Sequence, residues 1–279
     1  MEKEDDGMSN FINLEHFNLI DTKSASSKGN QQKWLVNNNW YKADYMGYEA
    51  LSEVVISKLL ERSNVENFVK YNITKIQFDN KIFTGCYSEN FKKKDDNIIT
   101  LERLSKSWLA NSMAKEIVKY SDTKDRIKFT VDFIEKVTGL NDVGKYITTM
   151  LELDAFFLNE DRHTNNIAFI LNDKTNSYSF CPFYDFGLSL LSDTMSDYPL
   201  DIDIYNAMNK IKAKPFSTNF DEQLDAAQEL YGNYLHFSFT GKDIENVVDD
   251  LVEYYSKEIL TRVKDILYYR KHKYTYMFS

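Results

Sequence analysis

The stretch that most constrains this chain is residues 154–187, where two short β-prone runs enclose a polar turn. The runs cover residues 167–171 and 178–183, and residues 172–176 between them read Asn-Asp-Lys-Thr-Asn. Turn-forming residues between two apolar runs predict an antiparallel hairpin. A hairpin brings its open ends together, so the residues just before its first strand and just after its second strand should be neighbours in space.

Three polar side chains lie at these open ends. Asn166 precedes the first strand, Asp185 follows the second, and Asp161 lies on the loop that enters the hairpin. Their oxygen atoms suit a hard cation such as Mg²⁺. The Asp-x4-Asn spacing, followed by Asp-Phe-Gly, is typical of the catalytic and metal loops of a kinase. In that pattern Asp161 orients the attacking hydroxyl and accepts its proton, while Asn166 and Asp185 hold metal.

Each motif also has a simpler interpretation. The Asp-Arg-His run would suit a surface salt-bridge cluster, and Asp-Phe-Gly would suit an ordinary turn after a strand. The two motifs in this order, joined by a predicted hairpin, favour the kinase pattern over both simpler interpretations.

Composition narrows the class of protein. A content of 43% hydrophobic residues over 279 residues is sufficient for one large core or two lobes. The chain has no apolar run long enough for a transmembrane helix, and its acidic start lacks the features of a signal peptide. Cys86 and Cys181 lie in apolar segments and predict reduced core thiols in a cytoplasmic protein. The net charge of −9 argues against nucleic acid or a membrane surface as partners.

The amino-terminal part predicts strands around a small polar loop. Residues 1–21 form a lead-in, of which residues 1–10 are predicted to be disordered. Residues 24–33 are small and polar, which suits either a flexible linker or a loop that covers phosphate groups. Two β-like runs follow, at residues 34–36 and 40–43.

Lys42 lies on the second of these runs, a short loop ahead of a predicted amphipathic helix over residues 48–62. Kinases pair a strand lysine with a helix glutamate. Glu49 and Glu53 lie one turn apart, and we favour Glu53 because it lies deeper in the helix, although either acid alone would suit a solvated surface. The predicted core positions of this helix are Leu51, Val55 and Leu59.

The rest of the chain predicts an α+β fold with two lobes. A hairpin over residues 72–78 and 81–87 and a charged connection over 88–97 complete an N-lobe at 22–97. The C-lobe, at 98–279, is mostly helical, and residues 188–197 are typical of an activation segment. Its predicted helices cover residues 101–115, 126–137, 141–157, 221–231, 242–254 and 256–272.

Taken together, these motifs resemble those of HipA-like kinases, the bacterial toxin-type serine/threonine kinases, and distantly those of phosphatidylinositol kinases. The resemblance covers about residues 22–270 and is closest to short, stand-alone members, because the chain has little room for an extra amino-terminal subdomain. The residues that carry it are Gly29-x-Gln31-x-Lys33, Lys42, Asn159-x-Asp161-Arg162-His163-x-x-Asn166 and Pro182-x-Tyr184-Asp185-x-Gly187-x-Ser189.

The resemblance implies a bilobal kinase that uses ATP and Mg²⁺ to phosphorylate a protein hydroxyl. It implies Asp161 as catalytic base together with Lys42 and Glu53, and Asn166 and Asp185 as metal ligands. The implied nucleotide contacts are Lys42, Ser27, Gly29, Gln31 and His163. Autophosphorylation is expected at Ser24, Ser26 or Ser27, and an antitoxin partner is left open.

Two other functions fit the same residues. A lipid or small-molecule kinase would use the same Asp-Arg-His-x-x-Asn motif, although the chain has no basic stretch that would face a membrane. A catalytically silent pseudokinase would act as a binding module, but such proteins typically lose one of the residues that are present here.

Overall fold

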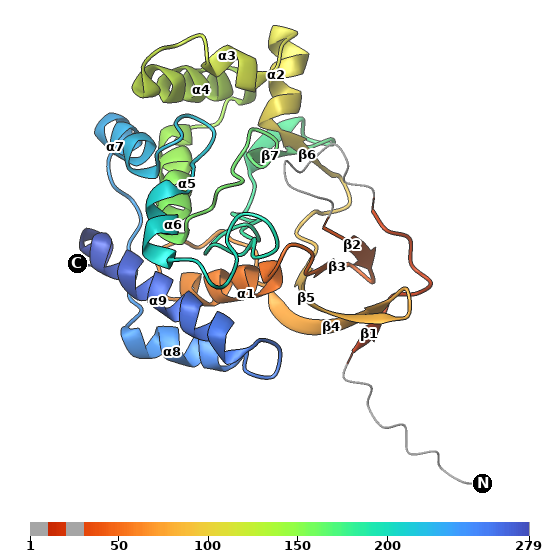
Figure 1. Cartoon of the computed structure of the whole chain (residues 1–279). Helices are drawn as coiled ribbons and strands as arrows, with labels where there is room; N and C mark the ends of the chain where they lie inside the picture. The colour runs from red at the N-terminus through yellow and green to blue at the C-terminus, as the bar shows by residue number, and fades with distance from the viewer. Residues whose placement is uncertain (1–10, 21–30, 279) are drawn as a thin grey trace, which may run out of the picture.

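The computed structural model describes residues 11–20 and 31–278. A curled sheet carrying the amino-terminal strands lies on one side of the molecule and a helical body on the other (Figure 1). The fold is therefore α+β and bilobal, as the sequence predicts. In the described ranges, no helix combines the length and apolarity that crossing a lipid bilayer requires.

The first sheet has the strand order β1-β4-β5-β3-β2. Neighbouring strands are antiparallel, except that β1 runs parallel to β4. Its strands are β1 (Ile12–Asn13), β2 (Lys33–Val36), β3 (Asn39–Ala43), β4 (Asn72–Phe78) and β5 (Lys81–Glu89). The predicted hairpin over β4 and β5 is confirmed, with Asp79 and Asn80 at φ values of 51° and 56° in its turn. Asp and Asn tolerate this left-handed region better than most residues, which makes them suitable for a two-residue hairpin turn.

The predicted helix over residues 48–62 is present as α1 (Glu49–Leu60), and its core positions Leu51, Val55 and Leu59 are fully buried. It is not amphipathic, however, because Lys58 is its one exposed residue. The reason is its position: α1 packs against β5 and β4 on one side and against α8 (Gly241–Asp249) on another. The helix belongs to the large core of the helical body.

A second sheet has the order β6-β7-β8, formed by β6 (Asp96–Thr100), β7 (Ala168–Asn172) and β8 (Ser177–Phe180). Strands β7 and β8 are the predicted hairpin. The second strand ends at Phe180, so the predicted extension to residue 183 is wrong. Pro182 has no N–H for the ladder, and Phe183 pairs instead with Phe68 in a separate parallel bridge.

The helical body is built around α5 (Val143–Phe157), which is buried on almost all sides and packs against α4, α7 and α9. The other helices are α2 (Leu101–Leu109), α3 (Met113–Ile117), α4 (Thr123–Thr138), α6 (Ile204–Lys210), α7 (Phe220–Tyr231) and α9 (Lys257–Lys273), followed by a 3₁₀ helix at Thr275–Phe278.

Two helix predictions need correction, and one helix was missed. The helix predicted over 101–115 breaks into α2 and α3, because Ala110 adopts a left-handed conformation with φ 52° and Glu102 accepts a hydrogen bond from the Met113 N–H. The helix predicted over 242–254 ends at Asp249 and continues as turns. Helix α6 was not predicted, since it is only seven residues long.

The buried residues form two clusters. A small one inside the first sheet contains Leu14, Trp34, Val36, Ala43 and Ile76, and a large one joins α1 to the helical body. Both cysteines are free and buried, as predicted, and burial raises the pKa of the Cys181 thiol to about 12. A protonated thiol is a poor nucleophile, so neither cysteine is placed for catalysis.

Candidate active site

Arg162 holds together the three segments on which the site residues lie. Its guanidinium is buried and forms an ion pair with Asp154 on α5, with Nε 2.9 Å from Oδ2 and Nη2 3.0 Å from Oδ1. Its Nη1 donates to the backbone carbonyls of Asn166, at 3.2 Å, and Tyr184, at 3.1 Å. One side chain thus ties the two ends of the β7–β8 hairpin to α5. The alternative of a surface salt-bridge cluster is therefore wrong.

Asp161 and Asn166 lie on the loop between α5 and β7, and both are buried. The Nδ2 of Asn166 donates to the carbonyl oxygen of Asp161 at 2.8 Å, which leaves the amide oxygen available to a ligand. The Nε2 of His163 lies 3.7 Å from Asp161 Oδ2, and its Nδ1 accepts a hydrogen bond from the Asn165 N–H at 3.2 Å. The loop therefore presents one carboxylate and one amide oxygen from a backbone held by hydrogen bonds.

Lys42 lies between two carboxylates. Its Nζ is 2.5 Å from Glu53 Oε1 and 3.0 Å from Asp185 Oδ1, and it donates to the Tyr71 hydroxyl at 3.3 Å. Burial alone would lower the pKa of Lys42, but the charges of Asp185 and Glu53 raise the pKa well above its usual value, so Lys42 is a cation. Burial would likewise raise the pKa of Asp185, yet Lys33 and Lys42 hold that pKa well below its usual range.

The structure thus distinguishes between the two helix glutamates. Glu53 binds Lys42 with one oxygen and accepts the N–H of Phe186 with the other, at 3.0 Å, so it also fixes the Asp-Phe-Gly segment. Glu49 turns away and accepts the N–H groups of Met46, at 2.6 Å, and Gly47, at 3.0 Å, just ahead of α1. Both acids are buried, so the interpretation as solvated surface charges is wrong.

Asp185 itself adopts a left-handed backbone conformation, with φ 64°. Its carboxylate is half-buried, and Lys33 on β2 lies 3.8 Å from its Oδ1. Gln31, at the near end of the small polar loop, has a buried side-chain nitrogen with no hydrogen-bond acceptor among the described residues. The other predicted loop residues, Ser24, Ser26, Ser27 and Gly29, lie outside the described part of the chain.

One charged neighbour of the site was missed from the sequence. Lys214, on the loop between α6 and α7, places its Nζ 3.3 Å from Asp161 Oδ1. Its carbonyl oxygen accepts a hydrogen bond from Gln223 at 3.2 Å, which anchors the loop to α7. Lys214 stands 53 residues after Asp161, beside a proline in an unremarkable polar stretch. No local signal in the sequence marks it.

The predicted activation-type segment is packed into the protein for much of its length. Ser189, Leu190 and Leu191 are buried, and the hydroxyl of Tyr48, the residue just before α1, donates to the Leu190 carbonyl at 2.7 Å. On the other side, the N–H of Glu160 donates to the Leu188 carbonyl at 3.2 Å. The segment is therefore held between α1 and the catalytic loop.

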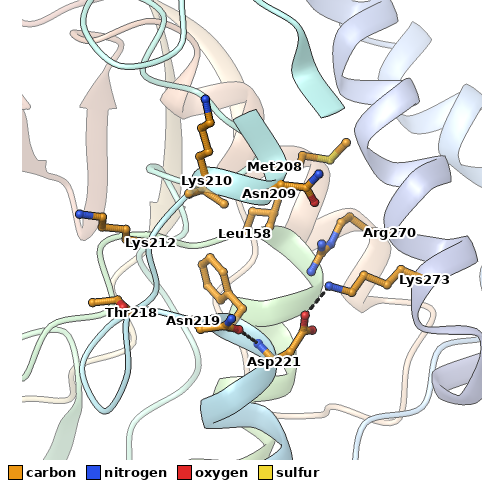
Figure 2. Close-up of a pocket in the computed structure, with 12 residues that line it drawn as sticks. Leu158, Met208, Asn209, Lys210, Lys212, Thr218, Asn219, Asp221, Arg270 and Lys273 are labelled. Atoms are coloured by element: carbon orange, nitrogen blue, oxygen red, sulfur yellow. Dashed lines mark hydrogen bonds and ion pairs between the residues drawn. The ribbon is translucent and has the colours of Figure 1, made fainter. Parts of the chain in front are cut away.

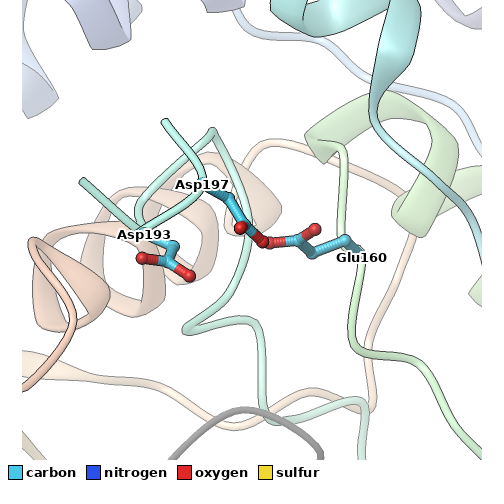
Figure 3. A group of neighbouring side chains, drawn as sticks. All are labelled: Glu160, Asp193 and Asp197. Atoms are coloured by element: carbon cyan, nitrogen blue, oxygen red, sulfur yellow. The ribbon is translucent and has the colours of Figure 1, made fainter. Parts of the chain in front are cut away.

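Three acidic side chains meet where this segment touches the catalytic loop (Figure 3). Oxygen atoms of Glu160, Asp193 and Asp197 lie within 4.8 Å of one another, and the Tyr198 hydroxyl donates to Glu160 Oε2 at 2.8 Å. Acidic side chains often gather in this way without a metal ion. The hydrogen bond from Tyr198 to Glu160 links the two segments at this point.

The residues present fit a magnesium nucleotide. Asp161, Asn166 and Asp185 offer hard oxygen ligands of the kind that Mg²⁺ prefers, and Lys42 and Lys33 place two cations beside Asp185. The unpaired side-chain nitrogen of Gln31, two residues before Lys33, adds a donor. Anionic phosphate groups and a divalent cation would satisfy both kinds of group at once.

Neither protein-family models nor curated protein sequences give a match to this chain. Among solved structures it is similar to the Helicobacter pylori proinflammatory kinase CtkA, with a TM-score of 0.61 and 17% identity over 96% of each chain. It also matches the HipA of Shewanella oneidensis MR-1, solved in a toxin–antitoxin complex with HipB and operator DNA. There the TM-score is 0.46 and the identity 13%, over 90% of this chain and 65% of that chain.

The match to CtkA extends over nearly the whole of both chains, so the two share one architecture rather than a single motif. At this level of identity the similarity concerns the fold. The chain therefore has the bilobal kinase fold of CtkA, and its predicted resemblance to HipA-like kinases is confirmed at the level of the fold.

Proposed function

We propose that this protein is an ATP- and Mg²⁺-dependent serine/threonine protein kinase. The observation that carries the proposal is the arrangement of charges around Lys42, which contacts Glu53 and Asp185 at once while Arg162 ties the Asp185 segment to the Asp161–Asn166 loop. Phosphoryl transfer requires little covalent chemistry from the protein, because positioning and charge neutralisation supply most of the rate enhancement. This site supplies both.

Each residue has a role that its contacts support. Lys42, held in place by Glu53, binds phosphate oxygens, and Lys33 adds positive charge from the neighbouring strand. Asp185 and the amide oxygen of Asn166 hold Mg²⁺, which when bound neutralises the phosphates. Asp161 orients the attacking hydroxyl and accepts its proton. Lys214, beside Asp161, places a positive charge where the transferred group carries negative charge.

Several finer features rest on the predicted resemblance alone. They are a protein rather than a lipid as substrate, autophosphorylation at Ser24, Ser26 or Ser27, an antitoxin partner and a cytoplasmic location. A lipid or small-molecule kinase would use the same site residues, and no described feature favours it. The pseudokinase alternative is disfavoured because Lys42, Asp161, Asn166 and Asp185 are all present and mutually oriented.

Two substitutions test the proposal. Asp185→Ala should abolish phosphate transfer from radiolabelled ATP to a protein mixture while leaving the circular dichroism spectrum unchanged. Asp161→Asn should lower turnover about 10²–10⁴-fold, the range typical of a general base, while ATP binding measured by calorimetry stays close to that of the wild type.

Asp225→Ala, which removes an exposed carboxylate on α7, is the matched control. Near-normal turnover in Asp185→Ala would refute the metal assignment. Labelled product in lipid vesicles, with none in protein, would favour the lipid-kinase alternative.

A further inference from the structure

A charged cavity separate from the candidate active site lies in the helical body, at the end of α5 (Figure 2). Its volume is about 290 Å³, and residues of α6, α7, α9 and the end of α5 line it. Four of its side chains are cationic and one is a carboxylate: Lys210, Lys212, Arg270, Lys273 and Asp221. The pocket therefore carries an excess of positive charge, in a protein whose net charge is −9.

Arg270 is the buried element of this pocket. It is only 2% exposed, and its Nη2 donates to the Ala155 carbonyl at 2.5 Å and the Tyr274 hydroxyl at 2.8 Å. Its Nε is buried and has no hydrogen-bond acceptor among the described residues. Figure 2 shows the guanidinium directed into the pocket. A buried donor without an acceptor carries a free-energy penalty that an entering anion would remove.

The other cations differ in how far they are already neutralised. Lys273 is paired with Asp221 at 2.6 Å, and the Tyr274 hydroxyl donates to the same carboxylate at 2.7 Å. Lys210 and Lys212 are exposed at the rim, and within the described ranges neither forms an ion pair. Their flexible stems let them turn toward a bound anion. Arg270 is thus a fixed donor at the base of the pocket, and Lys210 and Lys212 are flexible donors at its rim.

The size of the cavity restricts the ligand. Pockets that enclose a drug-sized molecule usually have volumes of about 300–1,000 Å³, and this cavity is at the lower limit. It suits a compact oxyanion, such as a phosphate or carboxylate group, better than a whole nucleotide. Such a group would have to belong to a larger molecule whose remaining part lies outside the pocket.

The position of the pocket indicates what that molecule is. Leu158, in its lining, stands three residues before Asp161, so their Cα atoms are at most about 11 Å apart. Lys212 stands two residues before Lys214, whose Nζ contacts Asp161. An extended peptide advances about 3.3 Å per residue. A side chain in the pocket would therefore be no more than about three or four residues from a hydroxyl at Asp161.

We propose that this pocket binds a phosphorylated or acidic side chain of the protein substrate and so selects substrates with such a residue within about four positions of the accepting hydroxyl. The proposal rests on the kinase function proposed above and deepens it. Its physical basis is the pairing of a compact oxyanion with Arg270 and the two lysines, which form charge-assisted hydrogen bonds to oxyanions.

Binding without catalysis is the first test. Fluorescein-labelled alanine–glycine peptides carrying one phosphoserine, aspartate or serine are titrated with the full chain, and fluorescence anisotropy is measured without nucleotide. The phosphoserine peptide should bind about tenfold more tightly than the serine peptide, as expected for two or three ion pairs of modest strength. The aspartate peptide shows whether a carboxylate is sufficient. Equal binding of all three peptides would overturn the proposal.

Two double variants locate the binding. Lys210→Ala with Lys212→Ala should remove most of the preference for the phosphoserine peptide and leave only the part that Arg270 supplies. Lys115→Ala with Lys136→Ala removes the same charge from exposed positions on α3 and α4 and should have no effect. Equal losses in both variants would mean a general charge effect. Displacement of the peptide by Mg-ATP would place it in the nucleotide site, and either result would overturn the proposal.

The binding test is separable from the kinase proposal. Asp185→Ala should bind the phosphoserine peptide as the wild type does, although it should transfer no phosphate. For substrate selection, serine peptides with an acidic residue within about four positions should be phosphorylated about tenfold faster than neutral ones, on the same basis as the binding difference. Activity without this preference would refute the role in selection while leaving the kinase assignment intact.

Discussion

Replacing Arg162 with methionine tests whether one buried ion pair supports both the stability and the activity of this protein. The substitution removes the partner of Asp154, which is 0% exposed, and the donor to the carbonyls of Asn166 and Tyr184. Among the described residues, the one side-chain donor that Asp154 then keeps is the Asn159 amide, whose Nδ2 donates at 2.8 Å. An almost unpaired carboxylate would then be left in the core.

The expected loss follows from these contacts. Removing one partner of a buried ion pair typically destabilises a protein by about 3–5 kcal/mol, because the remaining charge has lost its compensation. Domains usually have an unfolding free energy of about 5–15 kcal/mol, so Arg162→Met should remain folded at room temperature with a clearly lower urea midpoint. Tryptophan fluorescence during urea unfolding measures this midpoint.

A second variant separates charge burial from positioning. Adding Asp154→Leu to Arg162→Met removes the unpaired carboxylate, so much of the lost stability should return, because apolar replacements of buried pairs are often neutral or stabilising. Activity should not return, since the two carbonyls that Arg162 connects would still be unlinked. A loss below about 1 kcal/mol in Arg162→Met, which is typical of exposed pairs, would refute the argument. So would full activity in the double variant.

Three further predictions follow from other contacts. Lys214→Met should lower turnover about tenfold without changing ATP affinity, a smaller effect than that of an enclosed donor because the lysine is partly exposed; unchanged turnover would contradict its role. Burial and the charge of Glu49 raise the pKa of Asp44. The stability that the Asp44 side chain contributes to the folded protein is therefore fully present below pH about 4 and is lost as the pH rises. The unfolding free energy of the wild type relative to Asp44→Asn should therefore fall as the pH rises above about 4, and a constant difference would contradict this. Peptide mapping after incubation with Mg-ATP should find phosphate on Ser24, Ser26 or Ser27 as activity declines; an unmodified peptide from an active sample would refute autophosphorylation there.

The sequence alone predicted those elements that depend on residues close together in the chain. Turn residues between β-prone runs predicted both hairpins, and the left-handed conformations of Asp79 and Asn80 show why those residues suit their turn. Asp161 and Asn166 precede a predicted hairpin and Asp185 follows it. Because the open ends of a hairpin lie together, the sequence predicted that these three residues converge. For Lys42 the sequence favoured Glu53 over Glu49 without deciding between them, and only the packing of α1 showed that Glu53 is the partner.

Packing between distant segments decided the remaining features. The spacing of apolar residues in α1 predicted one buried face. In the structure the sheet and the helical body enclose this helix on nearly all sides, so Glu49 and Glu53 are buried as well. Helix α2 ends at Leu109. The Glu102 carboxylate, in the first turn of α2, accepts a hydrogen bond from the Met113 N–H at the start of α3. No local sequence pattern predicts either outcome.

Long-range contacts also completed the site. Lys214 reaches Asp161 from 53 residues away, and Arg270 lines the second pocket because α9 packs beside α6 and α7. Spacing along the chain predicts which side chains share a strand, a turn or a helix face. The charges that face one another across separate elements depend on how those elements pack, and burial then sets how strongly the charges interact.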